Sequence, residues 1–204
     1  MKLFNRLELD LNNLTCHSGG AEGSDTYFDT IFSKYGVKTK AYSYKTKYHK
    51  SENKVEISEA DYNEGVIEIT KANTSLKRYG IHKFMNLLAR NWPQVKYSQQ
   101  VFAIGVIVNP GERGSKGYVS NAKYQVIDGG TGYAVQMAIN NIKDVYVFDQ
   151  SKKCWFKWSY ITSTFIKCDP PKITSQDFAG IGTREINSDG IKAIEDLCSR
   201  TFNI

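Results

Sequence analysis

Apolar runs alternate with amphipathic segments along the chain. Residues 101–108 are almost wholly apolar, and residues 145–148 form a second apolar run, as expected of strands covered on both faces. Residues 25–35, 59–71 and 133–141 carry apolar side chains at helical spacing. Strands that alternate with helices predict an α/β fold with a Rossmann-like, doubly wound and mostly parallel sheet.

The remaining segments are assigned by the same criteria. We expect strands at 11–16, 37–44, 154–158 and 177–181, a long polar loop at 45–57, a helix at 84–92 that ends before Pro93, and an amphipathic last helix. A flexible turn at 109–117 and a returning strand at 124–127 predict a β-hairpin insertion near residues 101–127.

Composition narrows the class of protein. The 204 residues suffice for one sizeable α/β core, and 41% apolar and 24% charged residues are ordinary globular usage, so we expect a single domain, 1–204. No run of about 18 apolar residues is present, which excludes a membrane span on length. The first residues lack the long apolar stretch of a secretory signal, so a cytoplasmic location is expected.

Net charge and cysteine spacing limit the kinds of ligand, metal and macromolecule that we expect the protein to bind. The net charge is +6, but the basic residues are dispersed except at 38–54, which is interpreted as a solvated loop, so nucleic acid is not the favoured partner. A basic rim would still attract a phosphorylated ligand. The four cysteines are far apart and form no cluster with the three histidines, so no metal site and no cofactor is predicted.

Three glycine-rich segments stand where strand-like runs give way to helix-like ones: residues 18–25, 128–132 and 180–184. Glycine allows positive φ and close approach of a ligand to bare N–H groups, and the following helix adds a partially positive N-terminus. In parallel sheets such turns gather beyond the carboxyl ends of the strands. The three segments therefore predict one binding pocket for an anionic, phosphate-bearing small molecule.

The first segment offers several candidate groups. Gly19 and Gly20 are expected to present N–H groups to phosphate, and Ser18 and Ser24 are further hydroxyl donors. Asp25 is expected to cap the helix or to bind a ribose hydroxyl. The alternative is a tight strand–helix connection in which Asp25 serves only as a cap.

The other candidates follow the same logic. The second segment contributes the candidate ligand-binding residues Asp128, Gly129, Gly130, Thr131 and Gly132. The third contributes Gly182, Thr183 and Arg184, whose guanidinium can bind a phosphate bidentately or instead pair with Glu185. Arg90 and Asn91 can reach the same pocket, although a helix-terminal arginine also complements the helix dipole.

Aromatic side chains near these segments have two interpretations. Tyr27, Tyr133 and Trp92 are candidates to stack on a base, with a place in the core as the alternative.

The first two segments resemble motifs of the SLOG superfamily of Rossmann-like nucleotide-binding proteins. Residues 18–25, Ser-Gly-Gly-Ala-Glu-Gly-Ser-Asp, resemble the S-G-G-A-x-G-x-D element of its DprA-like branch. Residues 129–132 resemble the G-G-x-G element of its LOG hydrolase branch, and Arg90-Asn91 lies upstream, where that branch carries an arginine motif. SLOG relatives commonly associate, so the resemblance also implies a homo-oligomer.

Two departures from the SLOG pattern shape the functional expectation. The LOG hydrolases carry a catalytic glutamate where this chain has Gln136, which neither ionises nor accepts a proton at neutral pH. In SLOG domains the strand that ends in Gly-Ser-Arg or Gly-Thr-Arg comes first, whereas here it comes last. A circular permutation, with the strand–helix unit 177–204 packed beside the N-terminal strand, accounts for this order, and strand exchange between subunits is the alternative.

The resemblance implies a protein that binds a nucleotide-derived ligand of the ADP-ribose or cyclic ADP-ribose kind without turnover and has no catalytic residue. Such a protein would be a sensor or, if encoded by a phage, a sponge that sequesters an immune second messenger. One alternative is a nucleotide N-glycosidase or phosphoribohydrolase that uses Asp25, Asp128 or Glu185. The other is a DprA-like binder of single-stranded nucleic acid.

Overall fold

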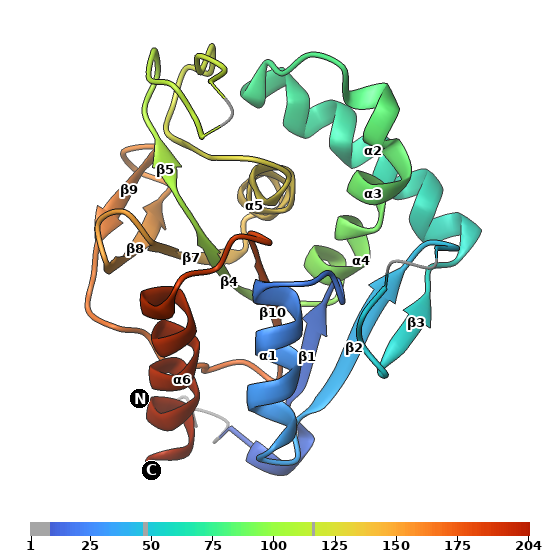
Figure 1. Ribbon diagram of the computed structural model, residues 1–204, viewed down its shortest axis with the longest axis vertical. Coiled ribbons are helices and arrows are strands. Elements are labelled where there is room, and N and C mark those ends of the chain that lie inside the picture. The colour runs from blue at the N-terminus through green and yellow to red at the C-terminus, as the bar shows by residue number, and fades with distance from the viewer. Residues whose placement is uncertain (1–8, 47–48, 116) are drawn as a thin grey trace, which may run out of the picture.

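The fold is built on one large β-sheet. The computed structural model describes residues 9–46, 49–115 and 117–204. Its strands are β1 (Thr15–Ser18), β2 (Lys38–Ser43), β3 (Lys54–Glu56), β4 (Gln100–Gly105), β7 (Asp144–Asp149), β8 (Cys154–Ser159), β9 (Thr164–Lys167) and β10 (Asp177–Gly182). They lie in the order β3-β2-β1-β10-β4-β7-β8-β9, with parallel pairing from β3 to β7 and antiparallel pairing of β8 and β9 (Figure 1). The predicted α/β fold with a Rossmann-like, mostly parallel sheet is confirmed.

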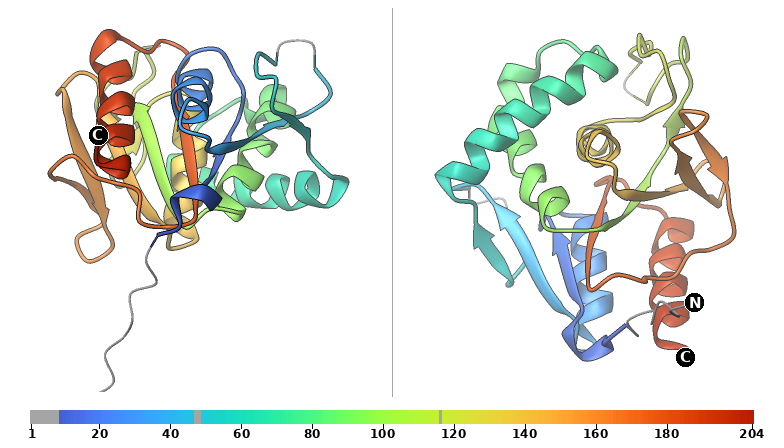
Figure 2. Two further views of the ribbon diagram at one scale, coloured as in Figure 1. Left: turned by 90° about the horizontal axis from the view of Figure 1, so that it is seen from below. Right: turned by 180° about the vertical axis from the view of Figure 1, so that it is seen from behind.

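Helices cover both faces of this sheet. They are α1 (Ser24–Ser33), α2 (Glu59–Leu76), α3 (Met85–Ala89), α4 (Asn91–Lys96), α5 (Thr131–Asn140) and α6 (Ser188–Phe202), with short 3₁₀ helices η1 (Leu11–Asn13) and η2 (Ile81–Phe84). Helices α1 and α6 lie side by side on one face, and α2 to α5 cover the other (Figures 1 and 2). Each face has its own apolar core, centred on Phe28 and Ile194 on one side and on Ile69 and Met137 on the other.

The C-terminal strand occupies the middle of the sheet. β10 pairs in parallel with β1 and with β4 of the same chain. Gly180 and Gly182 lie within this strand. An added Cβ at Gly180 would meet the Phe28 ring at 2.4 Å, and one at Gly182 would meet the Ser24 side chain at 2.6 Å. These glycines therefore let α1 approach the strand closely. The two glycines of the third segment thus end a strand rather than form a turn, and Thr183 and Arg184 begin the connection that leads to α6.

A hairpin extends from the carboxyl end of β4. Strands β5 (Ile107–Val108) and β6 (Val126–Ile127) pair antiparallel in a separate two-stranded sheet. The predicted hairpin insertion is confirmed, although its arms are shorter than residues 101–127 suggested because residues 100–105 belong to the central sheet. The predicted turn at 109–117 includes residue 116, which lies outside the described residues.

The structure corrects two predicted boundaries at turns. The predicted strand at 11–16 begins as η1, because the Asp10 carboxylate accepts a hydrogen bond from the Asn12 N–H and stabilises a 3₁₀ turn. The predicted helix at 84–92 is instead η2, α3 and α4, and Pro93 lies in the first turn of α4. A proline fits there because the first helical N–H groups have no acceptor within the helix.

Two edge strands were not predicted. The predicted loop at 45–57 includes β3, and residues 47–48 of that loop lie outside the described residues. Strand β9 pairs with β8 at the opposite edge of the sheet. Both strands are short and largely exposed, so their sequences lack the apolar runs that mark central strands. No helix of the described part of the chain has the length and apolar character to cross a bilayer.

Candidate functional site

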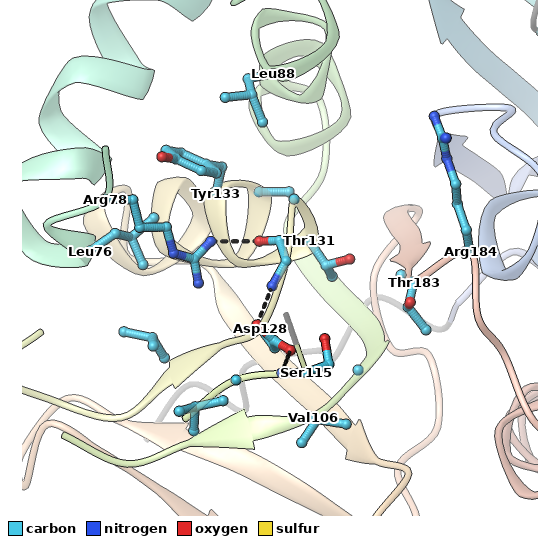
Figure 3. Close-up of a pocket in the computed structure, with 18 of the residues that line it drawn as sticks. Leu76, Arg78, Leu88, Val106, Ser115, Asp128, Thr131, Tyr133, Thr183 and Arg184 are labelled. Carbon is cyan, nitrogen blue, oxygen red and sulfur yellow. Dashed lines mark hydrogen bonds between the residues drawn. The ribbon is translucent and has the colours of Figure 1, made fainter. Parts of the chain in front are cut away.

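A cavity of about 1110 Å³ lies beyond the carboxyl ends of the central strands. Residues from all three glycine-rich segments line it, together with the end of α2, η2, α3 and the connection between β5 and β6. Figure 3 shows Asp128 and Thr131 on one side and Thr183 and Arg184 on the other. The volume lies slightly above the usual range for small-molecule sites.

The second glycine-rich segment presents free donors to this cavity. The Asp128 carboxylate accepts hydrogen bonds from the Gly129 N–H at 2.8 Å and the Ser115 N–H at 2.7 Å, which fixes the turn. Among the described residues, no acceptor contacts the N–H groups of Gly130 and Thr131, and both residues line the cavity. Unpaired N–H groups at the start of a helix as long as α5 favour an anion.

Asp128 is held in its ionised form. Burial on its own raises the pKa of Asp128, but hydrogen bonds from Ser115 and Gly129 and the nearby charge of Arg78 outweigh it and leave the pKa below its usual range. The carboxylate is therefore already occupied as an acceptor of backbone hydrogen bonds.

Arg78 holds the same turn from the opposite side, and sequence reasoning missed it. Its guanidinium donates to the carbonyl oxygen of Gly129 at 2.5 Å, a bond that Figure 3 marks, and to that of Ile127 at 2.6 Å. The guanidinium also lies 5.3 Å from the centre of the Tyr133 ring. Burial lowers the pKa of Arg78, and within the described chain no carboxylate forms an ion pair with it. A largely buried positive charge thus lies beside the free N–H groups of α5.

Asn73 fixes the backbone of Arg78. The Asn73 side chain donates to the Arg78 carbonyl at 3.0 Å, and its oxygen accepts from the Arg78 N–H at 3.2 Å and from the Tyr133 hydroxyl at 3.0 Å. The end of α2, the glycine turn and the start of α5 are therefore one hydrogen-bonded unit.

The third segment supplies an exposed cation. Arg184 lines the cavity, is exposed, and forms no ion pair with a described residue. The Thr183 hydroxyl accepts a hydrogen bond from the Glu185 N–H at 3.1 Å, and its backbone carbonyl accepts from the Ser24 hydroxyl at 2.8 Å. The alternative considered for Arg184, an ion pair with Glu185, does not form.

The first glycine-rich segment, residues 18–25, is largely buried. Arg90, itself 7% exposed, donates to the Gly19 carbonyl and lies 3.6 Å from the Asp25 carboxylate. The Asp25 carboxylate also accepts from the Gly182 N–H at 3.2 Å and the Ala21 N–H at 3.4 Å. Burial raises the pKa of Asp25, and Arg90 opposes this effect. Arg90 and Asp25 therefore form a buried ion pair at the cavity wall, which joins the first segment to the α3–α4 junction.

Several predicted residues are directed elsewhere. The residues that line the cavity are Asp25, Arg90, Asn91, Asp128, Gly129, Gly130, Thr131, Gly182, Thr183 and Arg184. Those that do not are Ser18, Gly19, Gly20, Ser24 and Gly132. Ser18 and Ser24 are fully buried and donate to backbone carbonyls, and the His49 ring lies so close to Gly20 that a Cβ there would meet it at 2.2 Å.

The glutamine at the position of the LOG glutamate faces away from this cavity. Gln136 donates to the Asn140 side chain at 2.9 Å and lines a different cavity of about 240 Å³.

The aromatic candidates divide between core and cavity. Tyr133 lines the cavity but is buried, with its ring beside Arg78 and its hydroxyl bonded to Asn73. Trp92 is buried, donates to Glu64 and does not line the cavity, and neither does Tyr27. In the described part of the chain no group of three or more His, Cys, Asp or Glu side chains is placed to hold a metal ion.

Comparisons of the chain with protein-family models, with curated proteins and with solved structures gave no match.

Replacing Arg78 with methionine is expected to lower the free energy of unfolding by about 2–3 kcal/mol, because two hydrogen bonds from a charged donor to backbone carbonyls are lost. Urea denaturation measures this change. The neighbouring exposed Lys77→Met is the matched control and is expected to change stability by less than about 0.5 kcal/mol. Equal effects of the two substitutions would contradict the assigned role.

Proposed function

We propose that this protein binds a nucleotide-derived small molecule of the ADP-ribose or cyclic ADP-ribose kind without turning it over. The observation that carries the proposal is the pair of free N–H groups at Gly130 and Thr131, which face the same cavity as Arg78 and Arg184. A helix N-terminus and two guanidinium groups, neither of which forms an ion pair with a described carboxylate, would offer donors to phosphate oxygens.

The shape of the cavity and the SLOG resemblance support a nucleotide over a simple anion. A phosphate needs only the floor of the cavity at α5, whereas about 1110 Å³ leaves room for a ribose and a base. Apolar side chains such as Leu76, Leu88 and Val108 line the remainder. The ligand therefore combines an anionic part with a part of low polarity.

The state of two of the three candidate carboxylates, Asp25 and Asp128, supports binding without turnover. Asp25 is engaged by Arg90 and two backbone N–H groups, and Asp128 accepts two backbone hydrogen bonds. A general acid or base must exchange a proton with the substrate, and these carboxylates are instead used to hold the chain. A protein that retains its ligand intact suits a sensor or a sponge for a nucleotide messenger.

Titration calorimetry of the purified chain with ADP-ribose, cyclic ADP-ribose and inorganic pyrophosphate tests the proposal. We expect saturable binding of at least one of the two nucleotide ligands, and unchanged ligand on chromatography after prolonged incubation. Absence of binding to both would overturn the proposal. Release of a free base, abolished in Asp128→Asn, would replace it with the N-glycosidase hypothesis.

Gly130→Val is expected to weaken binding of the nucleotide ligand at least tenfold while the fold stays intact. The Gly130 backbone has φ −63° and ψ −31°, which any residue adopts, and no atom lies within 4 Å of an added Cβ. The branched side chain would therefore occupy space beside the free N–H groups of α5 without a clash in the protein. Calorimetry measures the affinity, and thermal unfolding checks the fold.

Gln136→Val is the matched control, because it lies on the same helix but outside this cavity. Its affinity is expected to stay within twofold of the unaltered chain. Unchanged affinity in Gly130→Val would show that the ligand does not use the α5 N-terminus.

A further inference from the structure

Two exposed tyrosines flank the mouth of the cavity. Tyr79 is 93% exposed and Tyr118 is 80% exposed, and both line the cavity. Tyr79 belongs to the connection between α2 and η2, whereas Tyr118 belongs to the connection between β5 and β6. Figures 1 and 2 show the C-terminal end of α2 beside that second connection. The rings therefore come from two different walls of one site.

The walls below these rings are apolar. On one wall Leu76, Ile81 and Leu88 line the cavity, and on the other wall Val108 and Val126 do so. The first residues of α5, which we propose to bind the anion, line the same cavity, and this part of it is called the floor. A ligand anchored by a phosphate at the floor would place its next parts between apolar side chains and, at the mouth, between the two tyrosines.

The faces of the two rings have no partner in the described chain. Neither Tyr79 nor Tyr118 takes part in a ring–ring or cation–ring contact with a described residue. Most large aromatic side chains bury much of their surface, and an exposed pair at one cavity leaves its faces available for a planar ligand. Planar nucleobases stack on such rings irrespective of base identity.

We propose that Tyr79 and Tyr118 form a base-binding subsite that selects ligands carrying a nucleobase over other phosphate esters. The inference rests on the proposed function, because it assigns the second end of the same ligand. The phosphate is bound at the α5 N-terminus and the base lies between the two walls. The favoured class of ligand is thus a nucleotide whose base lies at the cavity mouth, and sugar phosphates without a base bind through the floor alone.

A comparison of ligands that share only one end tests this subsite. Titration calorimetry is carried out with ADP-ribose, which has both ends, and with ribose 5-phosphate, which lacks the base. The full chain is compared with Tyr79→Leu, Tyr118→Leu and both together. We expect each single substitution to weaken ADP-ribose about tenfold and to leave ribose 5-phosphate within twofold. Tyr79→Phe and Tyr118→Phe keep the ring and are expected to keep the affinity.

Tyr124→Leu is the matched control, because Tyr124 is also exposed but does not line this cavity. Its affinities are expected to stay unchanged. Equal weakening of both ligands by the Tyr79 and Tyr118 variants, or no change in ADP-ribose binding, would overturn the subsite.

The two proposals fail in different ways. If Gly130→Val weakens ADP-ribose binding and the tyrosine variants do not, the base-binding subsite is wrong while the proposed function stands. Saturation-transfer NMR with adenosine, which has a base and no phosphate, gives an independent readout. Signals from the adenine ring that disappear in the double tyrosine variant support the subsite, and signals that persist there contradict it.

Discussion

Replacing Arg90 with methionine is expected to lower the free energy of unfolding by about 3–5 kcal/mol. Arg90 and Asp25 are both almost fully buried, and their side chains are 3.6 Å apart. Methionine fills a similar volume but leaves the buried Asp25 carboxylate without its cation. The Gly19 carbonyl also loses its donor. Chemical denaturation at pH 7 measures the loss.

The pH dependence of the stability lost in Arg90→Met shows whether the unpaired charge of Asp25 causes that loss. Burial raises the pKa of Asp25 even with Arg90 present, so removal of Arg90 raises it further. A carboxyl whose pKa is higher in the folded than in the unfolded chain binds its proton more tightly when folded, so its ionisation destabilises the fold. The destabilisation of Arg90→Met is therefore expected to shrink as the pH falls from 7 towards 5.

Two further variants separate the ion pair from the loss of packing. The double variant Asp25→Asn/Arg90→Met removes the uncompensated charge and is expected to recover part of the stability and to lose the pH dependence. Arg184→Met removes an exposed cation that lines the same cavity and is expected to cost less than about 0.5 kcal/mol. A loss in Arg90→Met that is independent of pH would contradict the assigned ion pair.

The alternation of apolar and amphipathic segments was sufficient to predict the fold class. Central strands such as β4 and β7 are buried on both faces and carry continuous apolar runs, so they are visible in the sequence. The edge strands β3 and β9 are not, because pairing with one neighbour and exposure on the other side leave no apolar pattern. Pro93 was interpreted as a helix end, although the first turn of a helix also accepts proline.

The site was less predictable than the fold because its groups meet across long sequence separations. Arg78 contacts carbonyls 49 and 51 residues away, and nothing in the local sequence indicates this contact. The sequence predicts Arg90 as a ligand-binding group, and the structure adds a buried ion pair of its guanidinium with Asp25 that the sequence does not indicate. A glycine-rich motif predicts where no side chain shields the backbone N–H groups. Only the three-dimensional structure shows which of these N–H groups have no acceptor.

Gly132→Ala is expected to lower the free energy of unfolding by about 2–3 kcal/mol, and Gly130→Ala by less than about 0.5 kcal/mol. A Cβ at Gly132 would lie 2.1 Å from the Ile127 carbonyl oxygen and 2.8 Å from the Arg78 guanidinium, whereas one at Gly130 would meet no atom within 4 Å. Inside a helix alanine is more favourable than glycine by up to about 1 kcal/mol. The clash at Gly132 outweighs this gain, so Gly132→Ala is expected to be destabilising.

The two alanine variants therefore distinguish Gly132, where close packing leaves no room for a Cβ, from Gly130, where a Cβ meets no atom. The Ile127 carbonyl is backbone and accepts from Arg78 at 2.6 Å, so the alanine methyl at Gly132 must separate the turn from the start of α5 and break that hydrogen bond. Urea denaturation compares both variants with the unaltered chain. If Gly132→Ala were as stable as Gly130→Ala, the turn would have to adjust without cost, and Arg78 could not be the rigid support of the α5 N-terminus.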